Sequence, residues 1–82
     1  MDREVMQKEG RLSIKTKEAK RLELSIQSLI ESVRLHLDPT EIELLELNMP
    51  AAFQEMTELM DKWATYKGLR AEIKSIKKVL GR

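Results

Sequence analysis

The chain has 82 residues, of which 35% are charged and 41% hydrophobic, and its formal net charge is +1. This composition is typical of long amphipathic helices and disfavours both a sheet protein and a disordered chain. The absence of cysteine excludes disulfides and thiolate metal sites and fits a reducing compartment. No apolar run is long enough for a membrane span or a signal peptide, so we expect one soluble, cytoplasmic helical domain over residues 1–82.

The small net charge hides a strong segregation of charge along the chain. Residues 1–30 sum to +2, residues 31–61 to −7 and residues 62–82 to +6. The middle of the chain is therefore acidic and its carboxyl end basic.

The first long helix is predicted over residues 11–37. Its apolar residues fall within about 100° of arc on a helical wheel. They are Val5, Leu12, Ala19, Leu22, Ile26, Leu29, Ile30, Val33 and Leu37. Gly10 costs about 1 kcal/mol relative to Ala inside a helix. Because its neighbours are also highly charged, we expect residues 1–10 to fray or to form a separate turn of helix.

A capping pattern at Asp38-Pro39-Thr40-Glu41 predicts a short helix over residues 39–47. Asp38 can accept a hydrogen bond from the first-turn amides, Pro39 needs no donor there, and Glu41 completes a capping box. The residue before Pro50 is biased away from helical geometry, so the next helix begins there. The alternative is one bent helix from Pro39 onward with a kink at Pro50.

The last helix, predicted over residues 50–80, carries two apolar stripes. The first contains Phe53, Met56, Met60 and Trp63, and its line continues into Lys67, Arg70, Lys74, Lys77 and Lys78. The second, rotated by roughly a quarter turn, contains Leu69, Ile73, Ile76 and Leu80, with Gly68 at the changeover. For the cluster of Met49, Met56, Met60 and Trp63 we favour a core over a plastic partner-binding groove.

Two long helices joined by a compact acidic corner predict an all-α fold, an antiparallel helical hairpin that is coiled-coil-like and completed by self-association into a bundle. Aligning Leu37 with Pro50 places Ala19 opposite Gly68, either as a close backbone approach or as two unrelated small residues. The same alignment brings basic residues of both helices to the seam at the open end. Because like charges repel, we expect the hairpin to loosen, twist or bind an anion there.

Nothing in the sequence indicates an enzyme. His36 has no second His or Cys for a metal motif and is expected to be structural or solvent-facing. No nucleophile elbow, Walker loop or dinucleotide fingerprint occurs. We therefore predict no catalytic, cofactor-binding or metal site, no cofactor and no small-molecule substrate.

The function expected from the sequence is a non-enzymatic helical interaction or adaptor module that acts through self-association or a helical protein partner. Its candidate self-association residues are Leu24, Leu35, Leu69, Ile73, Ile76 and Leu80.

The alternative is a small nucleic-acid-associated protein that uses the basic residues at the open end of the hairpin. A membrane surface is a less favoured partner, and the acidic corner of another copy is a third anionic candidate. The candidate anion- or partner-binding residues are Lys8, Arg11, Lys15, Lys67, Arg70, Lys74, Lys77 and Lys78.

Overall fold

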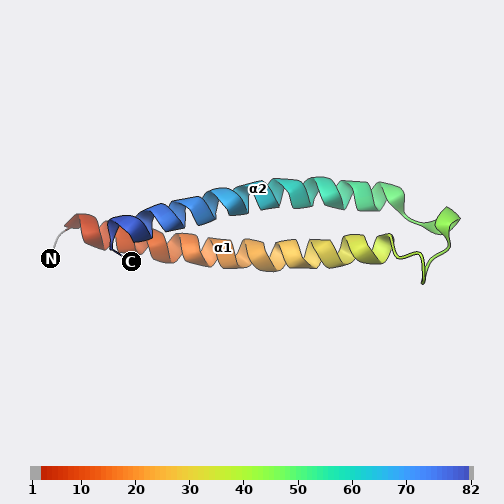
Figure 1. The fold of residues 1–82 in the computed structure, drawn as a ribbon, viewed down its shortest axis with the longest axis horizontal. Coiled ribbons are helices and arrows are strands. Elements are labelled where there is room, and N and C mark those ends of the chain that lie inside the picture. Colours follow the sequence, from red (N-terminus) through yellow and green to blue (C-terminus); the bar gives the residue numbers. More distant parts are fainter. Residues whose placement is uncertain (1–2, 82) are drawn as a thin grey trace.

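The computed structural model describes residues 3–81, which form a long antiparallel helical hairpin (Figure 1). Helix α1 covers Arg3–His36 and helix α2 covers Met49–Val79, with a single 3-10 turn, η1, at Leu44–Glu46 between them. The Cα extents are 64 × 17 × 15 Å, as expected for two such helices lying side by side at about 1.5 Å per residue. The predicted all-α hairpin is confirmed.

Helix α1 begins earlier than predicted. Residues 3–10 continue the helix without a break, so the expected fraying or separate turn is absent from this stretch, while residues 1 and 2 lie outside the described part of the chain. The segment around Gly10 is rich in Met, Gln, Lys and Glu. These are good helix formers, and together they outweigh the cost of about 1 kcal/mol for one glycine.

The corner between the helices is mostly irregular, and the predicted helix over residues 39–47 is reduced to η1. Asp38 does not cap a helix. Its Oδ1 accepts hydrogen bonds from Thr40 N at 2.9 Å and from Thr40 Oγ1 at 2.6 Å, which closes a local turn instead. Leu44 and Leu45 are exposed, so no packing holds a short helix there against its nucleation cost.

Helix α2 has its own cap, which the sequence analysis missed. Asn48 Oδ1 accepts a hydrogen bond from Ala51 N at 3.2 Å, and Pro50 lies in the first turn, where its missing N–H leaves no donor unused. Pro50 therefore starts a helix, and the alternative of a kinked helix from Pro39 is wrong. At the other end Gly81 has φ 77° and donates its N–H to Lys78 O at 3.2 Å, as in a glycine C-cap.

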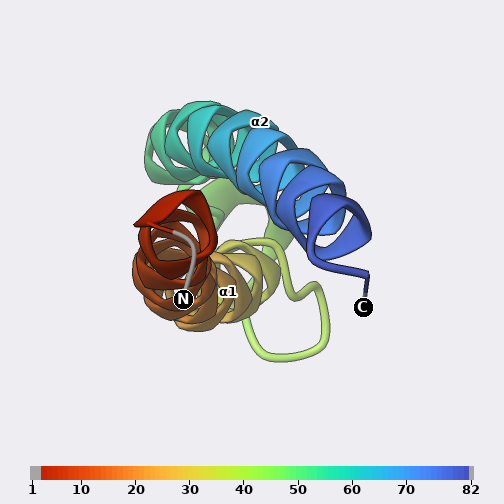
Figure 2. The same cartoon turned by 90° about the vertical axis from the view of Figure 1, so that its left-hand side faces the viewer.

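The helices meet along one line of α2. After Ala51, every residue up to the C-cap of α2 that is buried or half-buried lies on this line, at alternating intervals of three and four. These seam positions, with the capping residue Leu80, are Ala52, Glu55, Leu59, Lys62, Tyr66, Leu69, Ile73, Ile76 and Leu80. Viewed end-on, α2 passes obliquely across α1 (Figure 2), as expected when packed helices follow a spacing slightly shorter than the helical period.

The register of the hairpin agrees with the alignment of Leu37 with Pro50. At the levels implied by that alignment, Lys15 forms an ion pair with Glu72, and Lys62 Nζ donates to Ser25 Oγ at 2.6 Å. The most buried cluster contains Leu12, Ala19 and Ile73 and lies toward the open end. Of the three responses expected at the open end, loosening is not observed in the described residues, because apolar contacts close it.

Gly68 lies at the level of Ala19 but does not face it. Ala19 is buried beside Leu12 and Ile73, whereas a Cβ added to Gly68 would meet nothing within 4 Å. Of the two interpretations of this pair, the structure supports two unrelated small residues. Within residues 3–81, neither helix contains a stretch apolar enough and long enough to span a membrane.

Candidate partner-binding surface

Helix α2 presents an apolar stripe to solvent in the half of the hairpin next to the corner. Phe53 and Met60 are 76% and 67% exposed, and the other members of the stripe are also exposed. The stripe consists of Met49, Phe53, Met56, Met60 and Trp63. The preference for a core at Met49, Met56, Met60 and Trp63 is wrong, because these four side chains, like that of Phe53, lie outside the seam.

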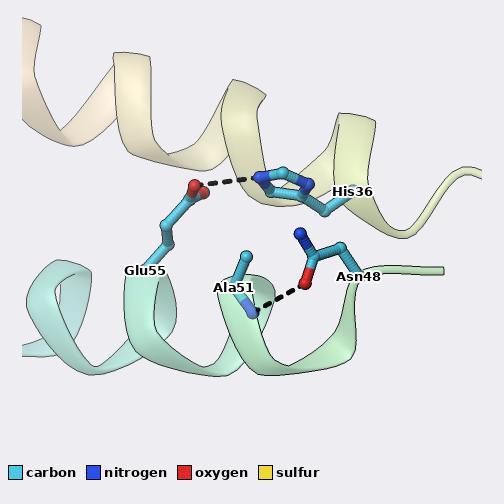
Figure 3. A network of polar contacts seen from close by, with 4 residues as sticks. All are labelled: His36, Asn48, Ala51 and Glu55. Atoms are coloured by element: carbon cyan, nitrogen blue, oxygen red, sulfur yellow. Dashed lines mark hydrogen bonds and ion pairs between the residues drawn. The ribbon is translucent and has the colours of Figure 1, made fainter.

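These side chains stay in solvent because α1 packs on the neighbouring line of α2. Near the corner, each residue of that line directly precedes a residue of the apolar stripe in the sequence. In the corner half this line is partly polar and is held by specific pairs. Lys62 bonds Ser25, and His36 Nε2 lies 3.0 Å from Glu55 Oε1 (Figure 3). Glu55 Oε2 is buried and receives no hydrogen bond from the described residues. The hairpin thus partly buries a carboxylate and a lysine side chain while Phe53, Met60 and Trp63 stay in solvent.

One residue of α1 and the residue that directly follows the helix extend this apolar surface across the seam. In an antiparallel pair, the residues directly after the seam positions of both helices lie on the same side of the hairpin. Accordingly, Arg70, which follows Leu69, shares a shallow groove with Lys20, which follows Ala19. By the same rule Ile30 and Leu37 share the side of Phe53, and both are partly exposed. We call these two residues and the α2 stripe together the outer apolar face.

A basic stripe continues the outer apolar face toward the open end. Lys67 Nζ lies 4.5 Å from the centre of the Trp63 ring, a cation–π contact that joins the two surfaces. The exposed residues Lys67, Arg70, Lys74, Lys77 and Lys78 form this stripe. They were expected to face the seam, but each lies beside it, because Leu69, Ile73, Ile76 and Leu80 occupy the seam itself.

The basic candidates of α1 do not join this stripe into a fork. Lys8 and Lys15 are partly buried, and the charge of Lys15 is paired with Glu72. Arg11 lines a groove with Ile14 and Glu72, on the opposite side of the hairpin from the groove of Arg70 and Lys20. The eight basic candidates therefore do not form one surface.

The candidate self-association residues fall into two groups, one exposed and one covered by α1. Leu24 and Leu35 are 58% and 63% exposed, as a free apolar surface requires. Leu69 and Ile73 are buried in the seam, and Ile76 and Leu80 pack against the same cluster. These four are covered by α1 and are not left over once the hairpin has formed.

The polar side chains near the corner bond one another within the hairpin. Glu58 lies 3.6 Å from Lys62 in the next turn, and His36 and Glu55 bond each other across the seam. Among residues 3–81 no group of three His, Asp or Glu side chains converges as a metal site would require.

One signal in the sequence identifies the outer apolar face. Stepping back from Leu80 by alternating four and three residues leads through Ile73, Leu69 and Tyr66 to Lys62 and Glu55. Continuity of this single line would have assigned the polar positions to the seam and Phe53 and Trp63 to solvent. Comparisons of the chain with protein-family models, with curated proteins and with solved structures found no match.

Proposed function

We propose that this chain is a non-enzymatic helical interaction module, which binds another helical chain through its outer apolar face. The single observation that carries the proposal is the exposure of Phe53, Met60 and Trp63 on one side of an otherwise ordered helix. Burying a Phe or Met side chain contributes about 1.5–3 kcal/mol, so a partner that covers several of them gains a large driving force.

The partner geometry we propose is a coiled-coil-like bundle. The seam already follows the three-and-four spacing of helices that wind around each other, and the outer apolar stripe has the same spacing one residue later. A partner helix can therefore pack on α2 as α1 does, without disturbing the seam. The absence of cysteine favours a reducing compartment such as the cytoplasm as its place of action.

The proposal can be tested by placing charges on the outer apolar face. Phe53→Glu with Met60→Glu should leave helicity by circular dichroism unchanged, because both side chains lie outside the seam, and should abolish association in sedimentation equilibrium. The matched control is Ile14→Glu with Val79→Glu, which alters two residues that are each 61% exposed and lie off this face. Equal association of wild type, variant and control would refute the proposal.

Nucleic-acid binding is a second candidate, because the basic stripe is exposed and adjoins an aromatic ring. Lys67, Arg70, Lys74 and Lys77 follow one line of α2, so they could neutralise successive phosphates. Reversal of Lys74, Lys77 and Lys78 to Glu should then remove salt-sensitive binding to a generic duplex. Binding to anionic liposomes, measured with the same variant, distinguishes a membrane surface.

A further inference from the structure

Three zones follow one another along the length of the hairpin. The acidic corner comes first, and its exposed carboxylates are Glu41, Glu43 and Glu46. The apolar stripe from Met49 to Trp63 follows and spans about 21 Å. The basic zone comes last and includes the groove where Lys17, Lys20 and Arg70 lie together with Glu23 and Thr16.

These zones decide how a second copy could cover the face. Two copies stacked in parallel would bury apolar residues against apolar residues, but would also stack corner on corner and basic zone on basic zone. Two antiparallel copies in full overlap would place the apolar stripe of each against the basic zone of the other. Both arrangements leave like charges opposed or charges buried without a partner, which costs free energy.

In an offset antiparallel pair, each apolar stripe packs on the other and each acidic corner lies near a basic zone. A twofold axis at the level of Met56, perpendicular to the hairpin, places Met49 of each copy near Trp63 of the other. The corner extends beyond the first turn of α2 along the hairpin axis (Figure 1), so it reaches past Trp63 of the other copy. Arg70, which shares its groove with Lys20, lies about 21 Å from Met56 along α2, so it faces the other copy beyond its Met49, on the side of the acidic corner.

We propose that the occupant of the outer apolar face is a second copy of this chain in this offset antiparallel arrangement, with Glu41 and Glu43 of each copy seated at Lys20 and Arg70 of the other. The inference rests on the proposed function and specifies its partner. The interface is isologous, because each copy supplies one corner and one basic groove, so the assembly closes at two copies. Both sites are open in the single hairpin, since all four of these side chains are exposed.

Charge reversal in trans tests this arrangement. The groove variant is Lys20→Glu with Arg70→Glu, and the corner variant is Glu41→Lys with Glu43→Lys. In a homodimer of either variant, both corner–groove contacts oppose like charges, so dimerisation should weaken by at least about tenfold at low ionic strength. In an equimolar mixture both contacts are again of opposite sign, so the heterodimer should form with an affinity near that of wild type.

The control for net charge is Arg11→Glu with Arg21→Glu, which makes the same charge change as the groove variant on residues that line the opposite side. It should dimerise as wild type does. Sedimentation equilibrium at two salt concentrations measures every mixture, and circular dichroism verifies that each variant stays helical.

The outcomes separate this inference from the proposed function. If the groove and corner variants dimerise as wild type does, or if their mixture does not recover, the offset arrangement is wrong. If wild type is a monomer, the second copy is the wrong occupant. If only the offset arrangement is wrong, the interaction module is judged independently, by whether Phe53→Glu with Met60→Glu changes association. A monomeric wild type counts against both.

Discussion

His36 at the end of α1 and Glu55 in the second turn of α2 bond across the seam, with His36 Nε2 3.0 Å from Glu55 Oε1 (Figure 3). The pair sits where the chain reverses, beside the Asn48 cap that begins α2. Because Glu55 lies on the seam line, this contact fixes which line of α2 faces α1. A polar pair within a helical seam is a known means of setting register.

Removing one member of this pair should destabilise the hairpin. His36→Ala leaves the partly buried carboxylate of Glu55 without its partner, so we expect the free energy of unfolding to fall by about 1–3 kcal/mol. Replacing both residues by Leu removes the desolvated polar groups and should restore or raise it. Urea unfolding followed by circular dichroism measures both. If His36→Ala lowered the free energy of unfolding no more than an exposed-site control such as Arg34→Ala, the contact would have no structural role.

Gly68→Ala should stabilise the protein by about 0.5–1 kcal/mol, because glycine in a helix interior is less favourable than alanine. The added Cβ meets nothing within 4 Å, so no clash offsets the gain. The contrasting variant is Gly81→Ala, which should destabilise because Gly81 has a φ of 77° that alanine rarely adopts. Thermal melts of the two variants measure these changes in stability. A loss of stability in Gly68→Ala would instead place residue 68 in the seam.

Asn48→Ala should lower the free energy of unfolding by about 0.5–2 kcal/mol, because the Ala51 amide loses its capping acceptor. Asn48→Asp keeps an acceptor at the cap and serves as the matched control, with little change expected. Denaturant unfolding of the two variants distinguishes loss of the cap from any general effect of substitution at the corner. Comparable losses in both would contradict the capping role.

The Asp38 turn predicts a pH effect of defined sign. The Thr40 hydroxyl, and then the Thr40 backbone N–H, lower the pKa of Asp38 below its ordinary value of 3.8 by hydrogen bonding to the carboxylate. Since the folded-state pKa is the lower one, the turn contributes its stability above the ordinary pKa and loses it as the pH falls through the depressed value.

Thr40→Val should therefore return the pKa of Asp38 toward 3.8, whereas Thr40→Ser, which keeps the hydroxyl, should leave it depressed. An NMR titration of the Asp38 carboxyl carbon measures the shift in each variant. A depressed pKa that persists unchanged in Thr40→Val would assign the effect to other groups in the corner.

The sequence by itself determined the two long helices, the acidic corner between them and their register. Periodic apolar residues and the two prolines define the elements, and the observed ion pair of Lys15 with Glu72 agrees with the register obtained by aligning Leu37 with Pro50. These features follow from local pattern and chain connectivity, which a single sequence contains. The Asn48 cap is also encoded locally, although the sequence pattern was used only to predict that a helix starts at Pro50.

Only the tertiary structure decided which of two adjacent lines of α2 faces α1. Phe53, Met60 and Trp63 made one line the more apolar near the corner, whereas Leu69, Ile73 and Leu80 favoured the other near the termini. A helix is stiff, so it presents one continuous line to a single partner helix. The packing at the open end and the His36–Glu55 and Ser25–Lys62 contacts together selected the second line, and the large apolar side chains of the first were left in solvent.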